Sequence, residues 1–295
     1  MSAVAPTAPI APIPAGTEAR VARRETFGQL ARSKTFIVGV VLVGWWVFWA
    51  IVSSRLTPED PLAQSDAVLA GMGAGHWFGT DQLGRDVLSR VLAGASDTMK
   101  VAPLATLLGI AGGTTVGLIT GYFRGWVDET ISRLIDAVLA LPLIVIAVTA
   151  LVALGSSNVT LIIVIGVVFT PIVARTVRAA VLGERALDYV SAARLRGERA
   201  PYIMFAEILP NITGPIVVEA TVRLGYAIFA VAGLTFLGFG VQPPSPDWSL
   251  QIADNYTLLN AGTYEWTVLF PGLAIATLIV GVNLIADGLQ QVLDR

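Results

Sequence analysis

Residues 188–211 read DYVSAARLRGERAPYIMFAEILPN, and this arginine-bearing stretch separates two long apolar runs. Its residues predict two short helices joined by a turn. Asp188 is placed to cap the first helix, and Gly197 is placed to end it in a left-handed conformation. Pro201 suits the first turn of the second helix, and Pro210 is expected to end that helix. The stretch indicates a surface that binds a partner protein. The alternative is that it is an ordinary connecting loop.

The composition of the whole chain is that of a membrane protein. Of its 295 residues, 55% are hydrophobic and only 14% are charged, and the mean hydropathy is +0.72. In soluble domains about a quarter of the residues are charged. We therefore predict an all-α polytopic membrane protein that contacts the lipid bilayer along its length. The net charge of −2 gives no indication of a nucleic-acid partner.

Metal and cofactor chemistry has little support in the sequence. The chain has no cysteine, which excludes disulfides and thiolate metal sites. We interpret the single histidine, His76, as structural or hydrogen-bonded rather than as a metal ligand. No resident metal or cofactor is therefore predicted.

Apolar runs of roughly the 20 residues that a bilayer requires predict six transmembrane helices. They lie at about 35–54, 101–122, 131–154, 160–182, 215–241 and 267–286. Pro142 and Pro171 interrupt the third and fourth runs and are expected to kink them. Trp45, Trp46 and Trp49 lie near the far end of the first run, where aromatic rings favour the membrane interface.

Four glycines in the second run follow one another at intervals of four residues, so they share one helix face. Small residues at this spacing allow the backbones of two helices to approach closely. The glycines are Gly109, Gly113, Gly117 and Gly121. They predict a tight helix contact, which is independent of what the protein transports.

The remaining segments are assigned from composition and periodicity. Residues 1–19 are rich in proline and alanine and are predicted to be a disordered tail, and residues 20–34 form a basic segment at the lipid headgroups. Residues 55–98 form a long extracytoplasmic segment, in which 87–95 predict an amphipathic helix lying flat on the membrane or on a partner. The alternative is that these residues begin the second span. A short inner loop is expected around 123–129.

Basic residues set the predicted orientation. With six spans and a cytosolic amino terminus, 14 of the 19 Lys and Arg residues lie on the cytosolic side. Residues 183–213 and both termini are then cytosolic. At membrane depth the ionisable residues are few, and Arg223 is expected to pair with Glu219 one helical turn away. The other two are Asp136 and Asp287.

Other classes of membrane protein fit the sequence less well. The chain contains no G-x-x-x-x-G-K-[ST] loop, so it cannot bind ATP in the usual way by itself. A membrane enzyme would need a nucleophile and a base that the sequence does not offer. A self-contained secondary transporter remains an alternative, but it would show internal repeats and acidic groups at mid-membrane.

The predicted cytosolic stretch resembles the EAA loop of bacterial binding-protein-dependent ABC importer permeases. The matching residues are Ala192, Ala193, Gly197, Ile208, Leu209, Pro210 and Asn211. Three further stretches look like those of the second, C-type permease of dipeptide, oligopeptide and nickel importers. They are HWFGTDQLGRDVLSR at 76–90, GFGVQPPSPDW at 238–248 and PGLAIATLIVGVNLIADGL at 271–289. The resemblance spans residues 24–295.

The resemblance implies a type I ABC importer permease fold over 35–295 and a non-enzymatic subunit of a larger complex. A second, B-type permease would complete the pore in a bacterial cytoplasmic membrane. Two ATPase subunits, or one fused ATPase, would bind ATP and Mg²⁺ on the cytosolic side. An extracytoplasmic binding protein would deliver dipeptides or oligopeptides, and nickel is the rival substrate.

Two candidate sites follow from the resemblance. The ATPase-coupling site comprises Asp188, Ser191, Ala192, Ala193, Arg194, Gly197, Ile208, Leu209 and Pro210. The extracytoplasmic gate or docking site comprises Gly79, Thr80, Asp81, Gly84, Arg85, Asp86, Gln242, Pro243 and Trp248. Two positions depart from the family pattern, because Ser191 stands where glutamate is usual and Val231 where an acidic residue is common.

Overall fold

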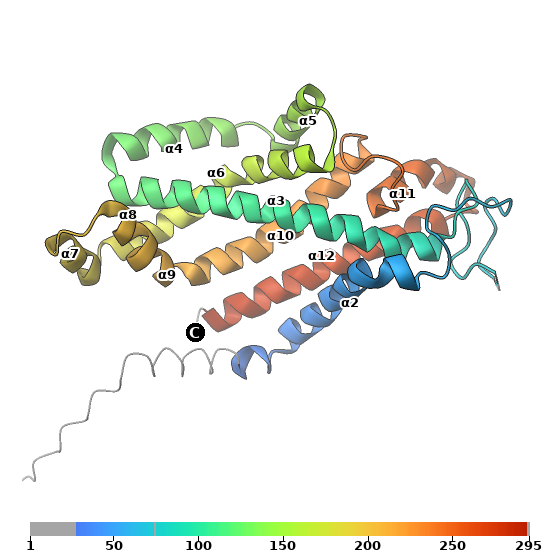
Figure 1. Cartoon of the computed structure of the whole chain (residues 1–295), viewed down its shortest axis with the longest axis horizontal. Helices are drawn as coiled ribbons and strands as arrows, with labels where there is room; N and C mark the ends of the chain where they lie inside the picture. Colours follow the sequence, from blue (N-terminus) through green and yellow to red (C-terminus); the bar gives the residue numbers. More distant parts are fainter. Residues whose placement is uncertain (1–27, 74, 294–295) are drawn as a thin grey trace, which may run out of the picture.

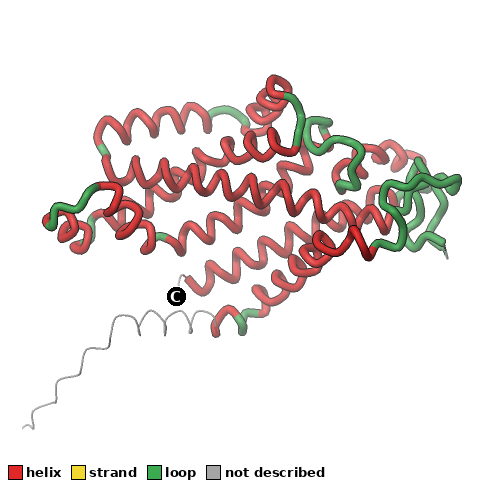
Figure 2. Tube along the Cα trace, in the orientation of Figure 1, coloured by secondary structure: helices red, strands yellow, loops and turns green. Residues whose placement is uncertain are grey.

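The computed structural model describes residues 28–73 and 75–293, and within them it is helical without a strand (Figure 2). The prediction of an all-α fold is confirmed. The predicted tail at 1–19 and the first part of the basic segment lie outside the described residues. In chain order the elements are α2 (Lys34–Leu56), α3 (Val87–Phe123), α4 (Gly125–Leu139), α5 (Leu143–Leu154), α6 (Asn158–Arg185), α7 (Asp188–Leu195), α8 (Ala200–Tyr202), η1 (Ile203–Ile208), α9 (Leu209–Asn211), α10 (Thr213–Phe236), α11 (Trp248–Asn255), η2 (Tyr256–Ala261) and α12 (Trp266–Leu293).

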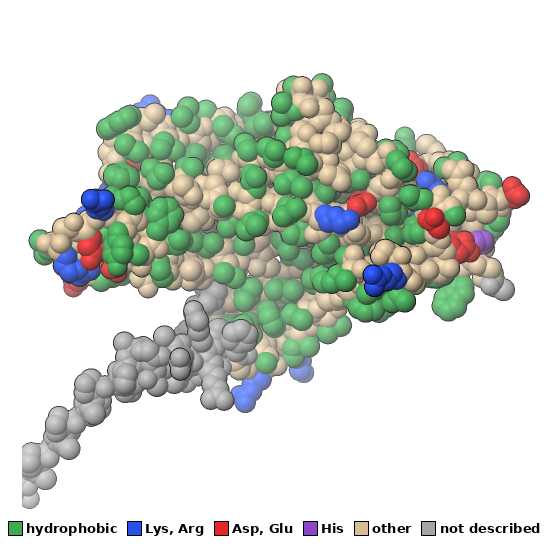
Figure 3. Space-filling view, viewed as in Figure 1, with side chains coloured by type: hydrophobic (Ala, Val, Ile, Leu, Met, Phe, Trp, Pro, Cys, Tyr) green, Lys and Arg blue, Asp and Glu red, His purple; other side chains and the backbone are tan. Residues whose placement is uncertain are grey.

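The six predicted spans correspond to five long helices and one bent pair. By length and composition α2, α3, α6, α10 and α12 are able to cross a membrane. Helices α4 and α5, with 15 and 12 residues, are each too short to cross alone and pass the same test only together, with a bend of 87° between them. Pro142 stands at this break, as its position in the sequence predicted. Hydrophobic side chains cover the middle of the molecule, and charged ones gather mainly towards its two ends (Figure 3).

The tightest contact in the bundle joins α3 to α6 along the predicted glycine stripe. A Cβ atom on Gly117 would lie 2.7 Å from Cβ of Val177, and one on Gly121 would lie 2.7 Å from Cβ of Val181. Carbon atoms in favourable contact are about 3.5–4.0 Å apart. The stripe therefore has no room for side chains, and the predicted close approach of two helices is confirmed.

A second contact between small residues, which we did not predict, joins α2 to α12. A Cβ atom on Gly39 would lie 2.7 Å from the carbonyl oxygen of Gly281, and one on Gly288 would lie 2.8 Å from Cβ of Phe36. Gly39 is on α2 whereas Gly281 and Gly288 are seven residues apart on α12, so no run of glycines four residues apart marks this contact. The first and last spans are thereby held side by side (Figure 1).

Two boundary predictions are wrong. Residues 87–95 do not form a separate helix on the membrane surface, because they are the first turns of α3. Their polar side is covered rather than solvated: Ser89 and Arg90 are fully buried beneath the loop that precedes α3 and the loop that precedes α11. The expected inner loop at 123–129 is also wrong, because Arg124 alone separates α3 from α4.

The prolines and the fifth span also depart from expectation in detail. Helix α6 continues through Pro171, and the helix bend is at Pro142. The fifth span ends at Phe236 instead of residue 241, because Gly238 takes a left-handed conformation with φ +85° and turns the chain.

Candidate coupling and gate sites

The predicted coupling stretch forms one end of the molecule (Figure 1). Helix α7 is attached there through Val190 and Ala193, which are both fully buried. They belong to one apolar cluster with Val177 and Val181 of α6 and with Ile203 of η1. The cluster also contains Leu118 of α3. Helix α7 is therefore packed onto the α3–α6 pair and is not a free loop.

Gly197 ends α7 as predicted. Its φ is +77°, and the N–H groups of Gly197 and Glu198 donate to the carbonyl oxygens of Arg194 at 3.0 Å and Ala193 at 3.2 Å. This is the pattern of hydrogen bonds that closes helices on a left-handed glycine. The prediction for Asp188 is wrong, because Leu187 is the cap residue and no side chain caps the helix. Asp188 is instead the first helical residue, where its negative charge interacts favourably with the positive end of the helix dipole.

The outward side of α7 presents small and apolar groups. Ser191, Ala192 and Arg194 are exposed, and Leu195 is 90% exposed. Leu195 is thus the most outward apolar side chain of α7, between the exposed Arg194 and Arg196. Ion pairs border this tip, with Arg196 Nε at 2.7 Å from Glu198 Oε1.

The second half of the stretch is a continuous helical segment through α8, η1 and α9. Ile208 is fully buried in the cluster beneath α7, and Leu209 packs against it. Pro210 is exposed and lies inside the last turn rather than ending it, since the helical residues reach Asn211. The Asn211 side chain donates to the carbonyl oxygen of Glu207 at 2.9 Å. Ile208 and Leu209 thus support α7 through the apolar cluster that they share with its buried side.

The predicted gate or docking residues lie at the opposite end of the molecule, among the loops on the right of Figure 1. Most are buried: Gly79, Thr80, Asp81, Gly84, Asp86 and Trp248. Gln242 and Pro243 are exposed, and Arg85 is partly buried. The buried side chains shape this end of the molecule, whereas the exposed ones are available to a partner.

Asp81 is the centre of the polar contacts at this end. Its Oδ1 accepts hydrogen bonds from the backbone N–H groups of Leu83 and Arg85 at 2.8 and 3.0 Å. Its Oδ2 accepts from Arg85 Nε at 2.7 Å and lies 3.6 Å from Arg90 Nε. Arg90 further donates to the carbonyl oxygens of Pro61 and Ser245. One carboxylate therefore ties the loop before α3 to α3 itself.

Trp248 fixes α11 to the spans beside it. Its indole Nε1 donates to the carbonyl oxygen of Val91 at 2.6 Å, and its ring meets Trp46 edge to face at 4.7 Å. Trp46 is itself buried and donates to Thr277 Oγ1 at 3.1 Å, so it is not the interface residue that its position indicated. Trp45, by contrast, is exposed. Four helices, α2, α3, α11 and α12, meet at this aromatic pair.

Asp247 caps α11 in a fully buried position that sequence reasoning missed. Its Oδ1 accepts from the N–H groups of Ser249 and Leu250 at 2.9 and 3.1 Å. Its Oδ2 is buried without a hydrogen-bond partner. Burial raises the pKa of Asp247 to about 6, against the opposing effect of the two backbone N–H groups. The Pro-Asp-Trp sequence was the available signal, because Asp before a helix is a preferred cap.

The two sequence positions at membrane depth that we singled out are explained by packing. Arg223 Nε lies 2.6 Å from Glu219 Oε1, so the predicted pair is confirmed. Val231 is 2% exposed inside the apolar core. An acidic side chain at this position would be buried among apolar side chains, so valine suits it better.

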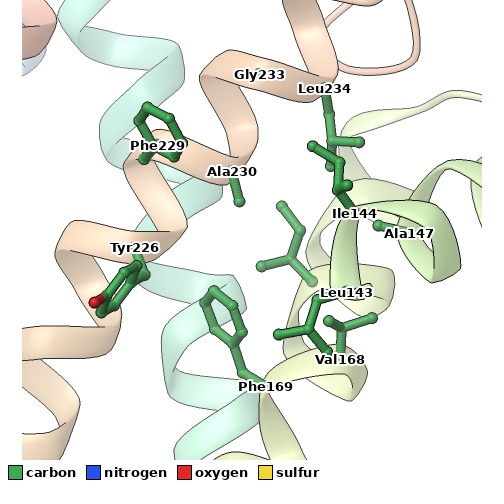
Figure 4. A pocket seen from close by; sticks show the side chains of 11 residues that line it. Leu143, Ile144, Ala147, Val168, Phe169, Tyr226, Phe229, Ala230, Gly233 and Leu234 are labelled. Atoms are coloured by element: carbon green, nitrogen blue, oxygen red, sulfur yellow. The ribbon is translucent and has the colours of Figure 1, made fainter. Parts of the chain in front are cut away.

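An apolar pocket lies between α5, α6 and α10 (Figure 4). Leu143, Phe169 and Ala230 face one another across it, and Tyr226 stands at its edge. Apart from Tyr226, none of the side chains that line it carries a polar group. Specific ligand sites combine apolar walls with a few placed polar groups. The pocket therefore offers no partners for the charged ends of a peptide.

Comparison with known proteins identifies the family. Residues 113–295 match the family described as binding-protein-dependent transport system inner membrane component. The chain is 39% identical to the dipeptide transport system permease protein DppC of Alkalihalophilus pseudofirmus, over 92% of this chain and 89% of that protein.

Two further relatives extend the comparison. The DppC protein of Escherichia coli is 38% identical, with 92% of each chain covered. The glutathione transport system permease protein GsiD of Pectobacterium atrosepticum is 33% identical, over 88% of this chain and 84% of that protein. The chain thus belongs to the family of binding-protein-dependent transport system inner membrane components and is a multi-pass membrane permease.

Proposed function

We propose that this chain is the C-type permease subunit of an ATP-driven importer of dipeptides or oligopeptides. The three relatives described above are named as permeases for dipeptides or glutathione, and none of the three is named for nickel. A second, B-type permease completes the translocation path. Two ATPase subunits, or one fused ATPase, bind and hydrolyse ATP with Mg²⁺, and this chain does no catalysis.

The observation that carries the proposal is the placement of α7. An exposed apolar tip at Leu195 stands on a helix whose other side is buried against α3 and α6. A cleft in an ATPase that covers this tip would remove its apolar surface from water. Because Val190 and Ala193 pack on the spans, a push on α7 is passed to α3 and α6 rather than absorbed by a loop.

Helix α7 lacks the usual acidic residue, and Ser191 occupies that position in an exposed site. The contact with the ATPase then relies on shape and apolar burial more than on a carboxylate at residue 191. Arg194, also exposed, lies over the Tyr122 ring at 4.9 Å and keeps its charge beside the tip. We expect Leu195 to contribute more to the contact than Ser191.

The gate or docking surface lies at the other end of the molecule. Gln242 and Pro243 are exposed there, together with Gln82 and Leu83 in the loop before α3. The buried Asp81 holds that loop in place through its hydrogen bonds. We propose that the exposed residues meet the binding protein and that the buried ones keep this surface rigid.

Sidedness is tested by labelling, which the absence of cysteine from the chain makes simple. Single variants Ala192→Cys and Gln82→Cys place a thiol at exposed positions of the two ends. In intact cells a membrane-impermeant maleimide is expected to label residue 82 and to spare residue 192. Residue 192 is expected to become labelled in lysed membranes from which the ATPase subunits have been stripped. Labelling of residue 192 in intact cells would contradict the cytosolic position of α7.

Coupling is tested in the assembled complex in lipid. Leu195→Asp is expected to lower peptide uptake and peptide-stimulated ATP hydrolysis together by at least tenfold. The matched control is Leu187→Asp, because Leu187 is also an exposed leucine beside α7 but lies at its start. Equal uptake in Leu195→Asp and the unaltered complex, with all subunits present, would refute α7 as the coupling helix.

A further inference from the structure

Three potential metal ligands from separate segments meet beside the start of α3. His76 Nδ1 lies 3.1 Å from Asp86 Oδ1 and 3.5 Å from Glu59 Oε1. All three ligand atoms lie within 4.8 Å of one another. The side chains of Asp86 and His76 are 4% and 18% exposed, whereas that of Glu59 is 44% exposed. The group is thus closed on one side and open to solvent on the other.

The spacing fits a tetrahedral cation. Zn²⁺ binds imidazole nitrogen and carboxylate oxygen at about 2.0–2.2 Å, which places neighbouring ligand atoms of a tetrahedron about 3.3–3.6 Å apart. The two distances from the His76 nitrogen are close to this value. Three protein ligands leave a fourth position, on the open side, for water.

The charge of the group also calls for a cation. Among the described residues, neither Glu59 nor Asp86 has a Lys or Arg side chain within ion-pair distance, and His76 is the partner of both. The nearby Arg85 and Arg90 pair with Asp81 instead. Two carboxylates beside a neutral imidazole carry two negative charges, which one divalent cation balances.

Ser89 and the α3 cap hold the ligands in place. Asp86 Oδ2 accepts from the N–H of Ser89 at 2.8 Å, which leaves Oδ1 directed to His76. Ser89 Oγ accepts from the N–H of Glu59 at 3.0 Å, so one serine positions both acidic residues. The carbonyl of His76 accepts from the N–H groups of Gly73 and Gly79. Supporting contacts of this kind are what a metal site requires around its ligands.

We propose that Glu59, His76 and Asp86 bind a divalent transition-metal ion of the Zn²⁺ class. Imidazole with carboxylates suits such ions, whereas Ca²⁺ needs six to eight oxygen ligands and Mg²⁺ needs octahedral geometry. The ion fastens the loop that carries Glu59 and His76 to the first turn of α3. This role is structural and does not depend on the transported substrate.

The test measures metal binding and stability in the purified complex, isolated through an affinity tag without histidine and stripped with a chelator. One equivalent of Zn²⁺ is expected to bind per chain by isothermal titration and elemental analysis, and to raise the melting temperature. Ca²⁺ and Mg²⁺ are expected to leave the melting temperature unchanged. His76→Ala and Glu59→Gln should weaken Zn²⁺ binding by about 100-fold or more. Asp66→Asn, an exposed acid in the same loop, is the matched control and should bind normally.

A protonated histidine that forms ion pairs with both carboxylates would have a similar geometry. The variant His76→Lys distinguishes this ion-pair arrangement from a metal site. Lysine keeps a positive charge between the carboxylates but is a poor metal ligand at neutral pH. If the group is a metal site, His76→Lys loses Zn²⁺ binding and the stabilisation that Zn²⁺ gives. If the unaltered complex shows no Zn²⁺ binding, or if His76→Ala binds as tightly as it does, the proposal is overturned.

Discussion

Replacing Gly117 by alanine tests the closest helix contact of this permease. The added Cβ would lie 2.7 Å from Cβ of Val177 and 2.8 Å from the carbonyl oxygen of Ala174. To restore contacts of about 3.5 Å, α3 and α6 must separate locally by somewhat less than 1 Å. Overpacking of this kind costs about 1–3 kcal/mol, and the better helix propensity of alanine returns up to about 1 kcal/mol. We expect a net loss of about 1–2 kcal/mol.

Gly44→Ala is the matched control, because Gly44 lies inside α2 and a Cβ there meets nothing within 4 Å. It has the same propensity gain without the contact, so we expect it to be neutral or slightly stabilising. Both variants are measured by thermal unfolding of the purified complex in one detergent. At about 2–4 °C per kcal/mol, Gly117→Ala should melt several degrees below Gly44→Ala.

A second substitution on α6 shows whether the loss arises at this contact. Val177→Gly removes the Cβ that the new methyl group meets, so Gly117→Ala with Val177→Gly should be more stable than the sum of the two single effects predicts. Val177→Ala keeps that Cβ and should give much less relief. If Gly117→Ala melts with or above the unaltered protein, or if both second substitutions act additively, the inferred contact is wrong.

Three further substitutions have definite expected outcomes. The pKa of Asp247 in the folded protein is raised to about 6, so its contribution to stability is complete below a pH of about 4 and is lost as the pH rises to about 6. Asp247→Asn should remove this pH dependence of the melting temperature. At pH 7.5 it should raise the free energy of unfolding by up to about 3 kcal/mol. Arg90→Met breaks a buried ion pair and two hydrogen bonds and should cost about 3 kcal/mol in thermal unfolding, whereas the exposed Lys100→Met should cost less than about 1 kcal/mol. Gly197→Ala forces φ +77° on a residue with a side chain and should loosen the end of α7 by about 1–2 kcal/mol, seen as faster hydrogen exchange there, and Gly183→Ala should not.

The sequence predicted the elements whose signals are local and missed those that depend on burial. Gly197 carries its own conformational requirement, and the Gly109–Gly121 stripe carries its spacing, so both predictions were confirmed. The polar face of 87–95 was misread, because polar residues on one side of a helix look the same whether water or a polar loop covers them. Two separate loops cover Arg90, one at Pro61 and one at Ser245, and no local pattern reveals that they meet there.

Helix α3 gives the two predicted sites a mechanical connection. Its 37 residues extend about 55 Å at 1.5 Å per residue. The buried Arg90 lies in its first turns beside the gate surface, and Leu118 lies near its other end in the cluster that holds α7. Because the glycine stripe brings the second half of α3 against α6, we expect the two helices to move as one body. A displacement of α7 would then reach the loops before α3 without passing through a flexible joint. Loosening the stripe with Gly117→Ala should therefore reduce uptake per ATP hydrolysed even where the complex stays assembled, since the helices could then slip against each other.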